Sequence, residues 1–362
     1  MTAVEAPAPG AEALVDRIVE SVVGTMDLFG IYLGHRLGYY RALADGGPAT
    51  SAELASRTGT AERYAREWLE QQAVTGILEA TPGDAASRCY SLPETFVEVL
   101  VDEMSAAFLA PMAQMAAACF RVGPEVVEAF RTGGGVSREA FGDDGREGQA
   151  AINRPYFGGA LVSDDLPSIP GIGERLRAGE ALTIADVGCG LGWSSIEIAR
   201  AFPSVRVDGF DLDTASIVRA RTQAEGDGLD DRVAFFDIDA AAAPGAGTYD
   251  LVTAFECIHD MPNPVEVLAT MRRVAAPGGT VVVMDERVAD EFAAPGDLVE
   301  RMMYGWSIAC CLPAGMTADG SSAATGTVMR LPVLEAYAKQ AGFAGVEVLD
   351  IENDFFRFYR LV

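Results

Sequence analysis

The spacing of hydrophobic residues changes near residue 181, and this change divides the chain into two parts of different type. Before it, apolar positions follow the three- and four-residue spacing of helices, and after it short apolar runs alternate with amphipathic stretches. The strand-like runs, followed by the clearest helical stretches, are 182–187, 205–210, 232–236, 249–255 and 279–285, then 194–202, 213–225 and 263–275. This alternation predicts an α/β fold with a parallel sheet and helices on both of its faces.

Two further apolar runs complete the predicted sheet. Residues 346–350 and 355–361 are close enough in sequence to pair as an antiparallel hairpin, which brings the sheet to seven strands. An insertion, 288–328, follows the fifth strand. Over 302–316 it carries Met, Trp and Tyr residues, which suit an apolar substrate pocket and ordinary core packing equally well. We expect one Rossmann-like domain over 181–362.

The first part of the chain begins with a tail and a pair of helices. Residues 1–13 contain neither a basic region nor an apolar segment, which indicates a disordered tail rather than a signal peptide. Residues 14–45 are apolar almost all round, so these helices need cover on more than one side. A partner subunit would supply that cover, and we therefore expect a homodimer.

A winged-helix pattern follows this pair. Thr50 and Glu53 form a capping-box start for a helix over 52–57. A second helix over 61–75 precedes two short strand-like runs, as in the wing of a winged-helix domain. The sequence thus predicts a winged-helix dimerisation domain over 14–102.

Residues 103–180 are predicted to connect the two domains. They contain a long apolar helical region, a glycine-rich hinge at 132–135, and then a stretch of mixed charge. We expect a helical connector that can lie over the mouth of the second domain as a lid. Tyr156 is a candidate lid aromatic, with core packing as the alternative.

The composition excludes several classes of partner. The net charge of −26 repels phosphate backbones and anionic lipid heads, so neither a nucleic acid nor a membrane is expected as partner. In the helix at 61–75, three glutamates offset Arg63 and Arg66, which argues against DNA binding through its face. No apolar run approaches the length of a membrane span, and the six cysteines lack metal-ligand spacing. These features indicate reduced thiols in a cytoplasmic protein.

The strongest chemical signal is the glycine turn after the first predicted strand. Gly188, Gly190 and Gly192 alternate, and a helix begins directly after them, an arrangement that brings a ligand close to bare backbone amides. The dinucleotide fingerprint needs a further glycine at the position of Trp193, and no lysine follows as in a triphosphate-binding loop. The turn therefore indicates another adenosine-containing ligand.

Acidic residues at the ends of three successive strands indicate which adenosine-containing ligand binds at the turn. Asp186 would oppose a pyrophosphate but suits the sulfonium and amino group of S-adenosylmethionine. Asp211 can accept both ribose hydroxyls, and Asp239 is placed to accept the adenine amino group. The residues expected to contact this cofactor are Asp186, Gly188, Cys189, Gly190, Asp211, Leu212, Asp239, Ala240 and Phe255.

On these residues the C-terminal half resembles class I S-adenosylmethionine-dependent methyltransferases. The run 186–192 matches their first motif, and Pro277-Gly278-Gly279 matches their usual turn before the fifth strand. With its winged-helix domain, the chain is similar to the two-domain enzymes of plant O-methyltransferase type. It is more similar still to an actinobacterial group of winged-helix methyltransferases, on the stretches 256–261, 284–287 and 324–330.

His259 is the candidate catalytic residue. The step His259-Asp260 after the fourth strand resembles the one that carries the general base of plant-type O-methyltransferases, and a neutral imidazole can take a hydroxyl proton. The resemblance gives Asp285 the role of steadying this histidine, with Glu286 as competitor. Glu256 is a further catalytic candidate, and for Glu256 and Asp260 a contact with the substrate or the cofactor amine is the alternative. The alternative is a histidine that caps the following helix.

The resemblance implies methyl transfer from S-adenosylmethionine to a small molecule, with oxygen as the expected acceptor. Transfer to carbon or nitrogen, and a cofactor-binding enzyme that does not methylate, stay open. A DNA-binding regulator that senses the cofactor is the alternative of another class. Some related keto-acid C-methyltransferases bind a metal with a His-Asp pair and a further histidine. The catalytic half of this chain contains no second histidine, so a metal site is not expected.

Overall fold

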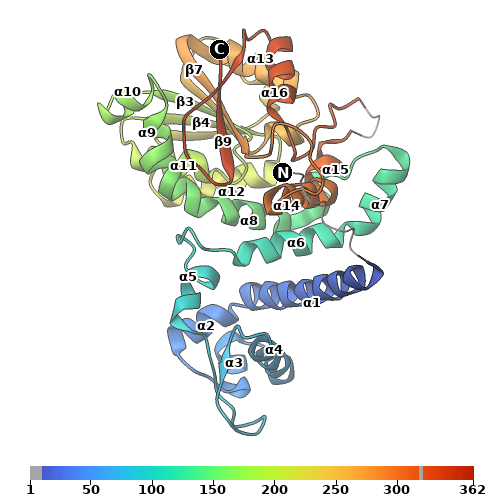
Figure 1. Cartoon of the computed structure of the whole chain (residues 1–362). Helices are drawn as coiled ribbons and strands as arrows, with labels where there is room; N and C mark the ends of the chain where they lie inside the picture. The colour runs from blue at the N-terminus through green and yellow to red at the C-terminus, as the bar shows by residue number, and fades with distance from the viewer. Residues whose placement is uncertain (1–9, 318–320) are drawn as a thin grey trace, which may run out of the picture. The chain divides into compact units, whose positions relative to one another are not determined.

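The structure is a computed structural model that describes residues 10–317 and 321–362. The chain divides into two compact units, Met1–Ala117 and Ala118–Val362 (Figure 1). The division lies inside the expected connector 103–180, so the beginning of that segment belongs to the first unit and the rest to the second. No helix of the described ranges is long and apolar enough to cross a membrane.

The first unit has the helix order of a winged-helix domain. Its elements are α1 (Ala11–Arg36), α2 (Tyr39–Gly46), α3 (Ser51–Thr58), α4 (Glu62–Val74), β1 (Glu79–Ala80), β2 (Tyr90–Ser91), η1 (Glu94–Phe96), α5 (Val97–Leu100) and α6 (Ala110–Arg121), whose last turn enters the second unit. Strands β1 and β2 pair antiparallel as the predicted wing. Helix α1 begins at Ala11, earlier than the expected start at residue 14, and the remainder of the predicted tail, 1–9, lies outside the described residues.

Local chemistry explains where α3 begins and ends. The Thr50 hydroxyl accepts from the Glu53 backbone N–H at 3.3 Å, and the Glu53 carboxylate accepts from the Thr50 backbone N–H at 2.8 Å. This is the predicted capping box, which satisfies two amides that the helix leaves without partners. At the other end Gly59 takes a left-handed conformation, φ +67°, and the helix stops there.

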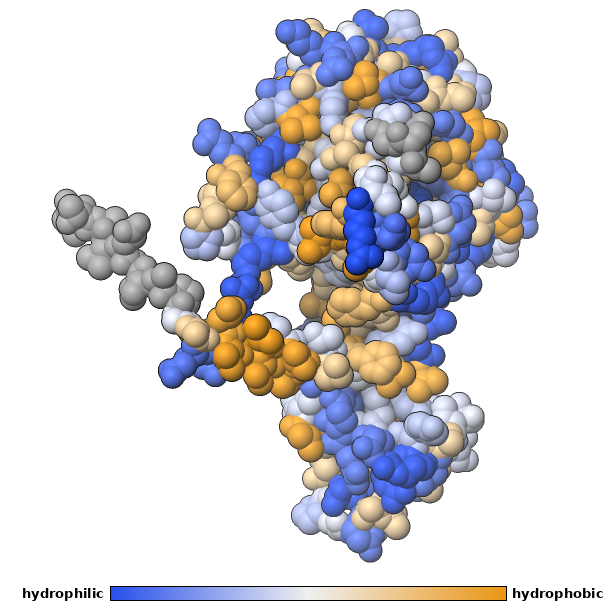
Figure 2. Space-filling view, turned by 90° about the vertical axis from the view of Figure 1, so that its right-hand side faces the viewer, coloured by the Kyte–Doolittle hydropathy of each residue, from blue (hydrophilic) through white to orange (hydrophobic). Residues whose placement is uncertain are grey.

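Helix α1 exposes a large hydrophobic face. Eight of its apolar side chains are between 53% and 59% exposed: Leu14, Val15, Ile18, Val19, Val22, Val23, Met26 and Phe29. Figure 2 shows hydrophobic residues gathered along this side of the helix. Seven of them repeat every four residues in two adjacent rows, and Phe29 follows three residues after Met26, so the eight form one continuous stripe.

The second unit contains the predicted seven-stranded sheet, in the order β5-β4-β3-β6-β7-β9-β8. The strands are β3 (Thr183–Val187), β4 (Arg206–Asp211), β5 (Val233–Asp237), β6 (Tyr249–Phe255), β7 (Ala275–Glu286), β8 (Val346–Val348) and β9 (Phe356–Leu361). The first five run parallel, and β9 pairs antiparallel with both β7 and β8. The fold class, the strand number and the terminal hairpin are all as the sequence predicts.

Helices cover both faces of this sheet (Figure 1). The helical elements are α7 (Gly123–Thr132), α8 (Arg138–Tyr156), η2 (Phe157–Asp165), α9 (Leu166–Ser168), α10 (Gly173–Arg177), α11 (Trp193–Ala201), α12 (Thr214–Gly226), η3 (Ala240–Ala242), η4 (Ile258–Asp260), α13 (Pro264–Val274), α14 (Leu298–Trp306), η5 (Ser307–Cys311), α15 (Leu312–Gly315) and α16 (Leu331–Gln340). Ile184 packs into a core with α11 and α12, whereas its neighbour Ala185 packs into a second core with α13 and α16. Successive side chains of a strand point to opposite faces, which explains this division.

The parallel strands bring several predicted site residues to one edge of the sheet. Because β3, β4, β5 and β6 all run in the same direction, the segments that follow Val187, Asp211, Asp237 and Phe255 begin at the same edge. In open α/β sheets, ligands bind in the crevice at the carboxyl ends of the strands. The candidate site is therefore built from the segments that leave these strand ends.

Candidate active site

The glycine turn after β3 has a backbone that only glycine adopts easily. Gly188, Gly190 and Gly192 have φ of +73°, +51° and +77°. A Cβ on Gly192 would overlap the Phe235 ring, and one on Gly188 would lie 2.7 Å from the Cys257 sulfur, whereas the space beside Gly190 is open. The turn thus presents bare backbone at the carboxyl edge of the sheet.

Asp186 lies beneath this turn and is almost fully buried. Its carboxylate accepts from the hydroxyls of Ser194 and Ser195 at 2.5 and 2.6 Å, and Thr253 lies 3.4 Å away. Burial raises the pKa of Asp186, and these three hydroxyls oppose that rise. The observed contacts join β3 to α11 and β6, and the expected contact with the cofactor amine stays a prediction.

Asp211 lies directly beside the glycine turn. Its Oδ2 accepts from the Gly190 backbone N–H at 2.8 Å, and its Oδ1 accepts from the Asp213 backbone N–H at 2.9 Å. Burial raises the pKa of this carboxyl, while the two amides lower it. Each oxygen keeps a further lone pair for a ligand. The adjacent Leu212 is 65% exposed, an unusual position for a large apolar side chain at a sheet edge.

The remaining expected cofactor residues lie after β3, after β5 and at the end of β6. Asp239 is exposed and caps η3, where its carboxylate accepts from the Ala241 backbone N–H at 2.8 Å. The Ile238 backbone N–H donates to the Asp211 carbonyl at 3.1 Å, so Asp239 follows directly on a residue bound to the end of β4. Phe255, Ala240 and Cys189 are buried in the two cores of the sheet.

The structure brings His259 and Asp285 together. His259 lies in η4 and Asp285 near the end of β7, and both are buried. Nδ1 of the imidazole lies 3.0 and 3.1 Å from the two carboxylate oxygens of Asp285, and 3.2 Å from Oε2 of Glu286. The two acids that the sequence offers as alternatives therefore both contact the same ring nitrogen.

The charges around His259 decide its protonation. Burial alone would lower the pKa of His259, but the carboxylates of Asp285 and Glu286 outweigh burial and raise that pKa well above its usual value. Burial also raises the pKa of Glu286 to about 8, against the opposing effect of His259. Near neutral pH the group therefore holds protons that isolated side chains would have released.

Glu256 has a strained backbone and a buried carboxyl. Its φ is +50°, which is uncommon for a residue with a side chain and often marks a functional site. The carboxylate accepts a hydrogen bond from the Asn153 side-chain amide. Burial and the nearby Glu286 together raise the pKa of Glu256 to about 8. Glu256 thus joins the same buried group of acids as His259.

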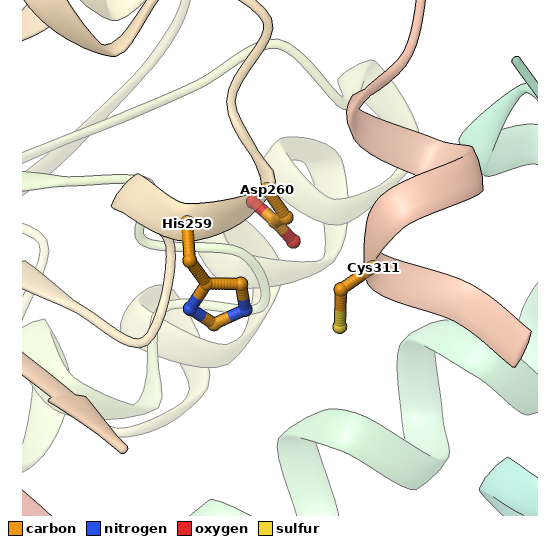
Figure 3. A group of neighbouring side chains, drawn as sticks. All are labelled: His259, Asp260 and Cys311. Atoms are coloured by element: carbon orange, nitrogen blue, oxygen red, sulfur yellow. The ribbon is translucent and has the colours of Figure 1, made fainter. Parts of the chain in front are cut away.

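Two further residues lie in this group: Cys311, which the sequence does not single out as a site residue, and Asp260, which directly follows the candidate base. Cys311 ends the π-helix η5, inside the insertion, and its thiol lies within 4.8 Å of a ring nitrogen of His259. Asp260 follows His259 and forms an ion pair with Arg138 at 2.7 Å. Figure 3 shows the side chains of His259, Asp260 and Cys311 turned toward one another. No motif in the sequence links Cys311 to His259.

Helix α8 supplies further side chains that sequence reasoning missed. Besides Asn153, it carries Arg154, whose guanidinium stacks 4.0 Å above the Trp193 ring at the start of α11. Tyr156 donates to Asp165 at 2.5 Å and packs against Phe356, which is a packing role rather than that of a free lid residue. No pattern around α8 points to these contacts, because each joins segments distant in sequence.

Comparison with known proteins identifies both domains. Residues 184–279 match the family model of a methyltransferase domain, and residues 27–102 match that of an Rv2258c-like winged helix-turn-helix domain. The 27-O-demethylrifamycin SV methyltransferase of Amycolatopsis mediterranei (strain S699) is 37% identical over 111 residues, 30% of this chain and 40% of that protein. The chain thus matches less than half the length of this relative.

Two solved structures share the fold over nearly the whole chain. The mitomycin 7-O-methyltransferase MmcR has a TM-score of 0.71 at 19% identity, covering 97% of this chain and 98% of that one. Human N-acetylserotonin methyltransferase, solved in complex with SAM, has a TM-score of 0.66 at 17% identity, covering 99% of each chain. These likenesses confirm the fold, and the chain therefore carries a winged-helix domain followed by a methyltransferase domain.

Proposed function

We propose that this chain, with its winged-helix domain and methyltransferase domain, transfers the methyl group of S-adenosylmethionine to an oxygen of a small molecule. The observation that carries the proposal is the buried pair His259–Asp285. His259 lies in the segment that follows β6, and this segment begins at the same edge of the sheet as the glycine turn. A turn that suits the cofactor and a positioned imidazole are the two parts that O-methylation needs.

The residues of the turn fit S-adenosylmethionine. Open space beside Gly190 gives access to the backbone, and the Asp211 carboxylate beside it has lone pairs for ribose hydroxyls. The exposed Leu212 side chain offers an apolar surface that an adenine ring would cover. No lysine or arginine lies within 186–192, which suits a cationic ligand better than a phosphate. When bound, the cofactor supplies an electrophilic methyl group on a sulfonium.

His259 is proposed as the base that takes the acceptor's proton. Because Nδ1 faces the Asp285 carboxylate, the N–H of a neutral ring lies on Nδ1, and the lone pair lies on Nε2. Asp285 thereby fixes the ring orientation and stabilises the cation that forms when Nε2 accepts a proton. The high pKa of His259 means that the ring must first lose a proton before it can act as a base.

We also propose that the protein works as a homodimer joined through α1. A stripe of eight large apolar side chains, each more than half exposed, is unusual on a monomer and suits a second copy of the same stripe. The DNA-binding alternative has weaker support. On α4, Arg63 pairs with Glu67 and Arg66 with Glu62, so the basic groups of this helix are already neutralised.

Calorimetry with S-adenosylhomocysteine tests the cofactor assignment without knowledge of the acceptor. The wild-type protein should bind it, and Asp211→Asn should weaken binding about tenfold or more, because hydrogen bonds to a charged group contribute about 1.5–3 kcal/mol. Asp230→Asn is the matched control, since Asp230 is exposed in the loop that enters β5 at its amino end, and it should bind as wild type. Absence of binding to the wild-type protein would refute the proposal.

A further inference from the structure

Three side chains of metal-ligating type converge beside the proposed base. His259 and Asp260 come from η4 and Cys311 from η5, and one donor atom of each lies within 4.8 Å of the others (Figure 3). Imidazole nitrogen, carboxylate oxygen and thiolate sulfur are the donors of zinc sites in proteins. The sequence predicts no metal site, because the catalytic half contains no second histidine. It does not link Cys311 to His259, since the two residues are far apart along the chain and no motif joins them.

The orientation of His259 suits a metal ligand. Its Nδ1 is held by Asp285, and Figure 3 shows the other ring nitrogen, Nε2, turned toward the Cys311 thiol. Histidines that bind metals commonly donate their other N–H to a carboxylate, which fixes the ring and increases the basicity of the ligating nitrogen. The Asp285–His259 pair has this arrangement on the side away from Cys311.

The position of Cys311 depends on an unusual helix. Residues Ser307–Cys311 form a π-helix, which is rare and is found frequently at functional sites. The neighbouring Cys310 thiol contacts Cys119 and Cys311 instead of His259. Of these two adjacent thiols, therefore, the one beside the imidazole belongs to Cys311.

Asp260 already forms an ion pair with a positively charged side chain. Its Oδ1 is buried, and the group that faces it is the Arg138 guanidinium, 2.7 Å away. The Arg138 side chain is about half exposed, so it can turn toward solvent when another cation takes its place beside the Asp260 carboxylate. Arg138 therefore competes with any other cation for Asp260 but does not block access to it.

We propose that His259, Asp260 and Cys311 form a binding site for a thiophilic divalent cation such as Zn²⁺. Zinc bond lengths place tetrahedral ligands roughly 3.3–3.8 Å apart. The three donors lie within 4.8 Å of one another, so they need to approach by at most about 1.5 Å. Three protein ligands leave one coordination position open, and the thiolate selects zinc over magnesium or calcium.

Occupation of this site excludes the base function, a consequence that rests on the proposed methyl transfer. Nε2 has one lone pair, and a bound metal takes the lone pair that would accept the acceptor's proton. The metal-loaded protein is then inactive in base-assisted transfer, and removal of the metal restores it. The site thus gives the enzyme a metal-dependent off state.

Cobalt(II) is the probe for the site, because thiolate ligation produces a charge-transfer absorption band in the near ultraviolet. Addition of Co²⁺ to the metal-free wild-type protein should produce this band with one ion per chain, and Zn²⁺ should abolish it. Cys311→Ser should lose the band, whereas Cys310→Ser, the matched control in the same π-helix, should keep it. Arg138→Ala should tighten binding several-fold by freeing Asp260. Absence of the band, or its loss in Cys310→Ser but not in Cys311→Ser, would overturn the proposal.

Nitrogen-15 NMR of the imidazoles tests the effect on His259 directly. The chain contains two histidines, so the ring signals of His259 can be followed against those of His35. Zn²⁺ should shift the Nε2 signal of His259 and leave His35 unchanged, and unchanged His259 signals at saturating Zn²⁺ would contradict the assignment. Neither experiment needs cofactor or acceptor. If the protein binds Zn²⁺ but not S-adenosylhomocysteine, the proposed function is refuted and the proposed metal site is supported.

Discussion

His259 combines a buried imidazole with two acids on one ring nitrogen, and its replacement has a defined consequence. His259→Ala should lower methyl transfer by about 10²–10⁴-fold, the usual contribution of a positioned base. Formation of S-adenosylhomocysteine from a panel of phenols and other hydroxylated small molecules is the measurement. Binding of S-adenosylhomocysteine itself should be unchanged.

His35→Ala is the control for this substitution, because His35 lies in the first unit and is the other histidine of the chain. It should keep wild-type transfer. Equal transfer by His259→Ala and wild type would refute the base assignment and favour a carbon or nitrogen acceptor that needs no base.

The buried acids around His259 predict how stability depends on pH. The pKa of Glu256 and that of Glu286 are raised to about 8, and the pKa of His259 is also raised. The folded protein therefore binds more protons than the unfolded chain between about pH 4.5 and 8, and stability falls as pH rises through this window. In Glu256→Gln, the decrease in the free energy of unfolding across this pH window should be smaller than in wild type, by an amount on the order of 1–3 kcal/mol.

Urea unfolding at a series of pH values measures this dependence. Glu335→Gln is the matched control, since Glu335 is exposed on α16 and should leave the pH profile as in wild type. If Glu256→Gln kept the full wild-type slope, the carboxyl would titrate at its ordinary pKa and would not belong to the buried group.

At the scale of elements, the glycine turn allows two substitutions of the same kind to be compared. Gly190 and Gly192 both have positive φ, but only a Cβ on Gly192 would overlap the Phe235 ring. Gly190→Ala should therefore cost about 1–2 kcal/mol of stability from backbone strain alone. Gly192→Ala should cost more, because the ring or the turn must also move.

Thermal unfolding and calorimetry with S-adenosylhomocysteine separate the two effects in these variants. We expect Gly190→Ala to remain folded and to bind the ligand less tightly, because its new methyl group stands in the open space beside the turn. A Gly192→Ala protein as stable as Gly190→Ala would show that the Phe235 contact does not constrain the turn.

The predictability of elements from sequence depends on the range of the interactions that form them. Strand β6 occupies the predicted residues 249–255, because its apolar run is buried on both faces. The capping box at Thr50 is equally local. The contact of Cys311 with His259 requires two distant segments and a π-helix, and no periodicity of side chains encodes either.

The same distinction applies to the candidate site. The glycine turn and Asp211 follow directly from strand ends, and the observed bond between Gly190 and Asp211 has this simple origin. Asn153 and Arg154 reach the site from α8, which the sequence shows only as a connector. Their contacts depend on how α8 packs against the segments after β3 and β6, which is a property of tertiary structure.

At the scale of the whole molecule, the net charge predicts that the protein does not bind nucleic acid. With a net charge of −26 and the ion pairs on α4, duplex DNA should not bind at physiological ionic strength. Fluorescence anisotropy with a labelled duplex, at low and at physiological salt, is the measurement. Tight binding that weakens steeply with salt would instead support the regulator alternative.

The exposed stripe of α1 predicts the assembly state. Two copies that bury this stripe against each other remove large apolar side chains from water, whereas a monomer leaves them exposed. This burial stabilises the dimer by about 25 cal/mol for each Å² of apolar surface buried.

Light scattering after size-exclusion chromatography should give twice the chain mass of 38.2 kDa for wild type. The double variant Val19→Glu/Val23→Glu should be a monomer, because a dimer would bury four uncompensated carboxylates. Val74→Glu is the matched control, since Val74 is 87% exposed on α4 outside the stripe, and it should remain a dimer. A dimeric Val19→Glu/Val23→Glu protein would place the interface elsewhere.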